Sequence, residues 1–181
     1  IPVVYNCGGY ETAETIGALS EYVDIWLPDL KYYSPILSRR YSQAEDYFAV
    51  ASRAVEQMIR LTGPPEFGEY KDKRSGTACS ILRKGVIIRH MVLPRHKDDS
   101  IRLLYWMKDT LPKGGFLISL MSQYTPFYRS ADYPEINRRI TTYEYEKVLN
   151  TAIELGLTDG FMQEKSSAKE EYTPPFELEG L

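Results

Sequence analysis

Polar side chains stand at or near the ends of four apolar runs in this sequence, where they could form a ligand site. In parallel α/β folds ligands bind beyond the carboxyl ends of the strands, because loops and helix N-termini converge there. The sequence therefore predicts a binding site at this end of a sheet. The candidate residues are Asn6, Asp29, Lys31, Arg89, Gln123 and Tyr124.

Arg89 is unusual among them, because it lies inside the apolar run GVIIRHMVL. A charge within a strand costs several kcal/mol unless it is paired, so we expect Arg89 to contact a ligand or to form a buried ion pair. Asp29 and Lys31 follow the run that ends before Pro28. These two residues could form an ordinary salt bridge in a loop or could be part of a ligand site.

Other reactive side chains have simpler interpretations. His90 alternates to the opposite face from Arg89, so we expect a hydrogen-bonded packing histidine. No cysteine or acidic ligand stands at an accepted spacing from His90 and His96, which argues against a metal site and a metal-dependent hydrolase. Cys7 is interpreted as a small buried residue in a turn rather than as a nucleophile. The tyrosine-rich stretches at 32–33 and 124–128 could stack on an adenine or a partner, or pack over the sheet edge.

Apolar runs alternate with amphipathic stretches, which is typical of strand–helix units around a parallel sheet. Thr141 and Glu144 have the spacing of a capping box at a helix start. Residues 64–84 are polar and predict a long loop or a hairpin. The expected strands are Pro2–Tyr5, Val23–Leu27, Gly85–Leu93, Phe116–Met121 and Gly160–Gln163. The expected helices are Thr12–Leu19, Gln43–Leu61, a helix around Ile101–Leu111, and one from Thr141 to a C-cap at Gly156.

Composition narrows the class of protein further. The 181 residues carry 22 basic and 25 acidic side chains, a net charge of −3. The segment Glu164–Leu181 alone accounts for this excess, with five Glu and two Lys, so the remainder is neutral and a nucleic-acid groove is not expected. No run approaches the roughly 18 apolar residues of a membrane helix. Two cysteines cannot build a disulfide framework, and they predict a cytoplasmic protein.

Five segments in order resemble one family. They are VVYNCGGYE, DIWLPDLKY, KGVIIRHMVLP, SLMSQYTP and FMQEKSSAKEEYTPPFELEGL. Together they resemble the later two-thirds of a radical S-adenosylmethionine protein of the branch related to pyruvate formate-lyase activating enzymes. The resemblance covers essentially the whole chain, and the ordered set is far more specific than any one segment.

The resemblance implies an α/β fold, a partial TIM-type (β/α) barrel of the radical S-adenosylmethionine type. About four to five parallel strand–helix units would be present in residues 1–163, followed by an extended acidic tail in residues 164–181 packed on or near the barrel. Because a barrel usually takes eight strands, these units cannot close one alone.

The resemblance also assigns roles by position. It implies that Lys31 meets the carboxylate of S-adenosylmethionine, that Arg89 approaches the same cofactor, and that Asp29 helps to hold a monovalent cation with Asn6 nearby. Tyr124 stands where the activating enzymes often have His, and Gln123 could replace that contact.

The implied activity is that of a radical oxidoreductase. With a four-iron four-sulfur (4Fe-4S) cluster, the full-length enzyme would form a 5′-deoxyadenosyl radical that abstracts hydrogen, for an activase from a glycyl radical enzyme as the protein partner. The motif C-x-x-x-C-x-x-C that holds such a cluster is absent, and Cys7 and Cys79 supply too few thiolates. The chain alone is therefore expected to bind no cluster and to be inactive.

Two further expectations follow from the abrupt start at Ile1. The chain is expected to be a fragment whose leading strand–helix units are missing, and its first strand to be an open edge that promotes self-association. The alternative function is a non-catalytic scaffold or partner-binding module derived from the same barrel.

Overall fold

The computed structural model describes residues 1–71 and 77–162. The predicted acidic tail, residues 164–181, lies outside this part of the chain. The central sheet has the strand order β1-β2-β4-β5-β6, and β3 pairs with β4 off this path. All pairs along the main path are parallel, whereas β3 and β4 are antiparallel. The predicted α/β class with a parallel sheet is confirmed.

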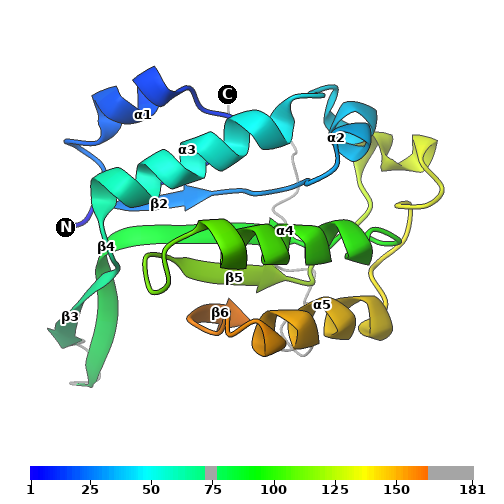
Figure 1. Cartoon of the computed structure of the whole chain (residues 1–181). Coiled ribbons are helices and arrows are strands. Elements are labelled where there is room, and N and C mark those ends of the chain that lie inside the picture. The colour runs from blue at the N-terminus through cyan, green and yellow to red at the C-terminus, as the bar shows by residue number, and fades with distance from the viewer. Residues whose placement is uncertain (72–76, 163–181) are drawn as a thin grey trace, which may run out of the picture.

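The strands and helices alternate along most of the chain (Figure 1). The strands are β1 (Val4–Cys7), β2 (Ile25–Pro28), β3 (Glu66–Lys71), β4 (Ala78–Met91), β5 (Leu117–Met121) and β6 (Gly160–Met162). The helices are α1 (Ala13–Leu19), α2 (Pro35–Ser42), α3 (Tyr47–Thr62), α4 (Lys97–Thr110) and α5 (Thr142–Glu154), with a 3-10 turn η1 (Tyr128–Asp132).

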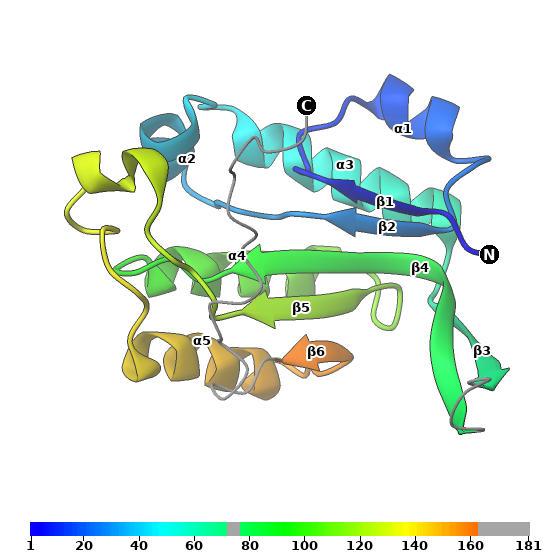
Figure 2. The ribbon, with the colours of Figure 1, turned by 180° about the vertical axis from the view of Figure 1, so that it is seen from behind.

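Helices α3, α4 and α5 cover one face of the sheet, in front of it in Figure 1 and behind it in Figure 2. Burial alternates accordingly along β4, because neighbouring side chains point to opposite faces. Val86, Ile88 and His90 are at most 1% exposed and belong to the helix-covered face. Ile87, Arg89 and Met91 are only partly buried on the other face. One face of the sheet is therefore buried under helices, and the other face is partly exposed.

Several predicted boundaries shift in the structure. The first strand is Val4–Cys7 rather than Pro2–Tyr5, because the pairing with β2 begins at Val4 and Ile25. Residues 64–84 contain the hairpin alternative, in which β3 pairs with the first half of a β4 that begins at Ala78, well before the predicted Gly85.

Two helical segments were not expected. Helix α2 has Pro35 at its first turn but lacks a clear apolar periodicity, and Gln43 closes it in the left-handed conformation with φ of 55°. This closure explains why α3 begins at Tyr47 instead of Gln43. The turn η1 is also too short and too polar to give a periodic pattern.

The last helix agrees with its sequence signals. The Thr141 side chain accepts from the Glu144 backbone and the Glu144 carboxylate accepts from the Thr141 backbone, which confirms the capping box. The helix ends one position earlier than predicted, with Leu155 as its C-cap and Gly156 after it at φ of 71°.

In the part of the chain that the structure describes, none of the helices has the length and apolar character needed to cross a membrane.

Candidate functional site

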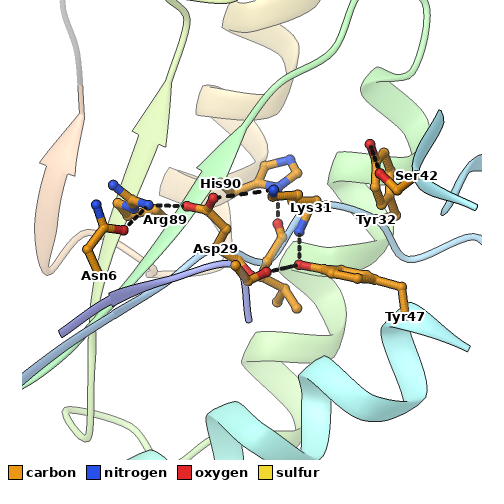
Figure 3. Close-up of polar contacts among 10 residues, drawn as sticks. Asn6, Asp29, Lys31, Tyr32, Ser42, Tyr47, Arg89 and His90 are labelled. Carbon is orange, nitrogen blue, oxygen red and sulfur yellow. Dashed lines mark hydrogen bonds and ion pairs between the residues drawn. The ribbon is translucent and has the colours of Figure 1, made fainter. Parts of the chain in front are cut away.

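Asn6 of β1 and the residues Asp29 and Lys31 that follow β2 lie near Arg89 of β4 at one end of the sheet (Figure 3). An Arg89 guanidinium nitrogen lies 2.6 Å from Asp29 Oδ1, and the same nitrogen donates to Asn6 Oδ1 at 2.6 Å. The Lys31 ammonium lies 3.6 Å from Asp29 Oδ2. The structure thus brings together four of the six candidate residues, and it places Arg89 in an ion pair.

The backbone of Asp29 and Leu30 is fixed by both neighbouring strands. The Asp29 N–H donates to the carbonyl of Cys7 at the end of β1, and the Leu30 N–H donates to the carbonyl of Arg89 in β4. Asp29 and Arg89 also form an isolated parallel bridge. Because these bonds continue the sheet pattern beyond β2, the carboxylate of Asp29 is held at the position where it meets Arg89.

Tyr47 of α3 adds a second support from the helix layer. Its hydroxyl lies 2.7 Å from the carbonyl oxygen of Asp29 and 2.9 Å from that of Gly8, and it accepts from the Lys31 N–H at 3.1 Å. Burial raises the pKa of this phenol, so it stays protonated and able to donate. Tyr47 therefore connects the ends of β1 and β2.

His90 supports the same segment from the helix-covered face. Its Nδ1 lies 2.6 Å from the Leu30 carbonyl oxygen and its Nε2 lies 2.8 Å from Ser100 Oγ. A carbonyl can only accept, so Nδ1 carries the proton. Nε2 then accepts from Ser100, because complete burial lowers the pKa of the imidazole and keeps it neutral. The expectation of a hydrogen-bonded packing histidine is confirmed.

A cavity of about 200 Å³ opens beside the charged residues. Charge gathers on one side of it, where Asp29, Lys31 and Arg89 lie. Its remaining wall is apolar or aromatic, so a ligand with a charged end and an apolar body would match both sides. The lining residues are Asp29, Lys31, Tyr32, Arg89, Met91, Leu93, Met121 and Tyr124.

Arg89 has a hydrogen-bond donor that could still bind a ligand. Its Nε atom is buried and has no hydrogen-bond partner among the described residues, although the other end of the guanidinium is paired. With one carboxylate and two cations, the group Asp29, Lys31 and Arg89 has a formal charge of +1. A buried donor without a partner and an excess of positive charge both favour an anionic ligand group here.

Of the two remaining candidate residues, Tyr124 and Gln123, only Tyr124 lies at the cavity. Tyr124 lines the cavity, and burial raises its pKa. Gln123 is exposed and is absent from the lining, and its amide lies 3.9 Å from the Met121 sulfur. Cys7 is 8% exposed and burial raises the pKa of its thiol to about 12, so its predicted burial is confirmed. The residue is the last one of β1, however, rather than part of a turn.

The tyrosine-rich stretches divide between packing and exposure. Tyr32 is buried and packs edge-on against Tyr47, with ring centroids 5.5 Å apart. Phe127 and Tyr128 are 69% and 83% exposed.

In the described ranges 1–71 and 77–162, no group of three or more His, Cys, Asp or Glu side chains could hold a metal ion. His96 instead contacts the Tyr41 hydroxyl at 2.7 Å.

Sequence reasoning missed Tyr47 and the methionine wall of the cavity. Tyr47 sits on an amphipathic helix, where a core position is the simpler reading, and its hydroxyl contacts depend on loops distant in sequence. Met91 and Met121 are register partners on β4 and β5, on the face that lacks covering helices. The only sequence signal was the alternation of side chains along each strand.

Comparison with known proteins gives a relative but no function. The chain is 31% identical over 154 residues to a protein of Methanocaldococcus jannaschii that is named only as uncharacterized protein MJ0674. The match includes 84% of this chain and 38% of that protein, so the chain spans well under half of the length of this curated relative. No known family profile matches the chain.

Proposed function

We propose that this chain is the S-adenosylmethionine-binding portion of a radical S-adenosylmethionine enzyme related to pyruvate formate-lyase activating enzymes. The observation that carries the proposal is the pairing of Arg89 with Asp29 beside Lys31, at the cavity mouth where the family resemblance puts the cofactor. These residues fit the cofactor's amino-acid end, because Lys31 is 46% exposed on its side chain and Arg89 has an unpartnered Nε.

The arrangement of layers supports a partial TIM-type barrel. In a closed barrel all helices lie outside the sheet and the other face points inward. A doubly wound sheet would instead have helices on both faces. Here α3, α4 and α5 lie on one side (Figure 2), and the site residues Arg89 and Met91 lie on the opposite face.

The chain's own residues would act by binding and orientation. Lys31 and Arg89 would contact the carboxylate, while Asp29 would keep both cations in place and is the candidate for a monovalent cation. The cavity of about 200 Å³ is smaller than the roughly 300 to 1,000 Å³ of a site that encloses a whole ligand. It would therefore hold one part of the cofactor. In the complete enzyme the cofactor would supply the radical chemistry of hydrogen abstraction.

The described residues do not fit the iron–sulfur cluster. Three thiolates are needed, whereas Cys7 is buried at the carboxyl end of β1 and Cys79 is exposed in the antiparallel part of β4. Any cluster ligands would come from outside this chain, and so would contacts to a glycyl radical enzyme as partner. This misfit also favours the second candidate function, a partner-binding module that uses the barrel fold without the cluster.

Calorimetric titration of the 181-residue chain with S-adenosylmethionine tests the proposal. Lys31→Met and Arg89→Gln should each weaken binding about tenfold or more, because each removes a charge-assisted contact. Lys147→Met, an exposed charge removal on α5, is the matched control and should leave the affinity unchanged. Absence of binding by the folded chain, or equal loss in all three variants, would favour the non-catalytic module.

A further inference from the structure

The hairpin of β3 and the first half of β4 projects away from the rest of the molecule (Figures 1 and 2). Residues Ala78 to Lys84 pair with β3 alone, and β4 joins the parallel sheet only from Gly85 onward. In the described chain β3 has β4 as its one strand partner. The outer edge of β3 therefore presents backbone groups that no described strand satisfies.

The hairpin also exposes apolar side chains. Phe67 and Tyr70 of β3 are 56% and 45% exposed. A two-stranded hairpin of this kind is marginally stable by itself in water, and at least a third strand or a covering element normally stabilises it. An open edge with exposed aromatic residues is a template for pairing with another strand.

The charge pattern of β3 identifies the strand that fits this edge. Glu69 and Lys71 are two positions apart, so their side chains lie on the same face of the hairpin. In an antiparallel pair of two β3 strands centred on Tyr70, Glu69 of each copy lies directly opposite Lys71 of the other. Opposite charges at directly facing positions stabilise a strand pair, and like charges destabilise it.

The outer edge of β4 does not offer the same match. Between Ala78 and Lys84 its only charged residues are Arg83 and Lys84, so two copies of this edge have no carboxylate with which to pair these cations. Pairing β3 of one copy with β4 of another would not be two-fold symmetric, so it would produce rings or open chains of molecules rather than a closed pair. Among the pairings of the two described hairpin edges, only that of β3 with β3 is both closed and charge-complementary.

We propose that a second copy of this chain pairs with β3, which forms a two-fold dimer through a continuous antiparallel sheet of four strands in the order β4-β3-β3-β4. The interface is distinct from β1, an edge strand of the main sheet path, because β3 lies off that path and pairs with β4. It lies away from the charged cavity, so it is independent of cofactor binding.

A charge exchange tests the proposal on the whole 181-residue chain by sedimentation equilibrium at hundreds of micromolar. The variant E69K places Lys opposite Lys, and K71E places Glu opposite Glu, so each should raise the dimer dissociation constant about tenfold or more. The double variant E69K/K71E should restore the wild-type constant. A mixture of the two single variants should form a heterodimer, because each then meets its opposite charge.

Spin labels on Cys79 of the two copies would measure the distance between the two hairpins in the dimer. It pairs with Tyr70 inside the hairpin and is exposed, whereas Cys7 is buried with its pKa raised to about 12, so a nitroxide reagent will label Cys79 selectively. Three strand spacings separate the two Cys79 Cα atoms in the dimer, about 14 Å. Pulsed electron resonance should therefore detect a short distance between labels, which is lost in E69K.

Three results would overturn the proposal. The first is a chain that remains monomeric over the whole concentration range. The second is a dimer whose dissociation constant is unchanged by both single charge reversals. The third is a dimer in which the two labels lie far apart. The second and third results would point to another edge, such as β1. Thermal unfolding of each variant confirms that the exposed substitutions leave the fold intact.

Discussion

The Nδ1 atom of His90 donates a hydrogen bond of 2.6 Å to the carbonyl oxygen of Leu30, the residue between Asp29 and Lys31. A fully buried histidine thus connects the helix-covered face of the sheet to the charged site on its other side. His90 also contacts Ser100 of α4 at 2.8 Å. The position of the Asp29–Lys31 segment therefore depends on the protonation of a core residue.

This relationship predicts a loss of stability at mildly acidic pH. Burial holds the pKa of His90 below its usual range in the folded protein, so its contribution is complete above the unfolded pKa of about 6.5. As the pH falls below that value the unfolded chain binds a proton and the folded one does not. The free energy of unfolding should decrease by up to about 1.4 kcal/mol per pH unit from this group.

Urea unfolding of wild type and His90→Gln between pH 5 and 8 measures this effect. The variant should show a flatter pH dependence and lower stability at pH 8. His96→Gln is the comparison, because burial also lowers the pKa of His96 but this residue is only partly buried, and it should flatten the profile less. An unchanged slope in His90→Gln would contradict the assignment of a neutral buried His90.

Gly9 provides a test of how closely the β1 turn approaches the site. Its φ is +81°, and a Cβ at this position would overlap the backbone carbonyl of Asp29. Gly9→Ala should therefore cost about 2 kcal/mol or more of the free energy of unfolding. It should also weaken S-adenosylmethionine binding, because the Asp29 backbone must move.

Gly8→Ala is the matched control, since a Cβ there meets no atom within 4 Å. It should change stability by less than about 1 kcal/mol. If the two alanine variants have equal stability and equal affinity, the close approach of the turn to Asp29 does not matter for the site.

The thiols predict that the chain by itself assembles no iron–sulfur cluster. Anaerobic incubation with iron and sulfide should leave the folded protein without the visible charge-transfer absorption of thiolate-bound clusters, because Cys7 and Cys79 cannot supply three ligands. Stoichiometric iron and sulfide that stay bound after gel filtration would contradict this prediction.

Much of the site could be predicted because it depends on strand ends. Asn6, Asp29 and Arg89 occupy equivalent ends of neighbouring parallel strands, and a parallel register brings such positions together without further information. The cost of an unpaired charge in a strand predicted either a ligand contact or a buried ion pair for Arg89, and the structure shows an ion pair with Asp29 that is only partly buried. The Thr141 capping box also needs only local spacing, and the structure confirms it.

The rest depends on contacts between segments that are far apart in sequence. The hydroxyl contacts of Tyr47 depend on where α3 crosses the ends of β1 and β2, which no local pattern encodes. The hairpin half of β4, Ala78–Lys84, is largely exposed and mixes apolar with polar residues, so it lacks the long apolar run that identified the other half. Gln123 was predicted at the site from its place after β5, yet only its neighbour Tyr124 lines the cavity.

The central claim is that Lys31 and Arg89 bind the carboxylate of S-adenosylmethionine, and a titration with two ligands tests it most directly. Wild type should bind S-adenosylmethionine at least about tenfold more tightly than its decarboxylated analogue, because the analogue lacks the group that these cations contact. In Lys31→Met the difference between the two ligands should shrink, and in the control Lys147→Met it should persist. Equal affinity of the folded wild-type chain for both ligands, or no affinity for either, would contradict the account.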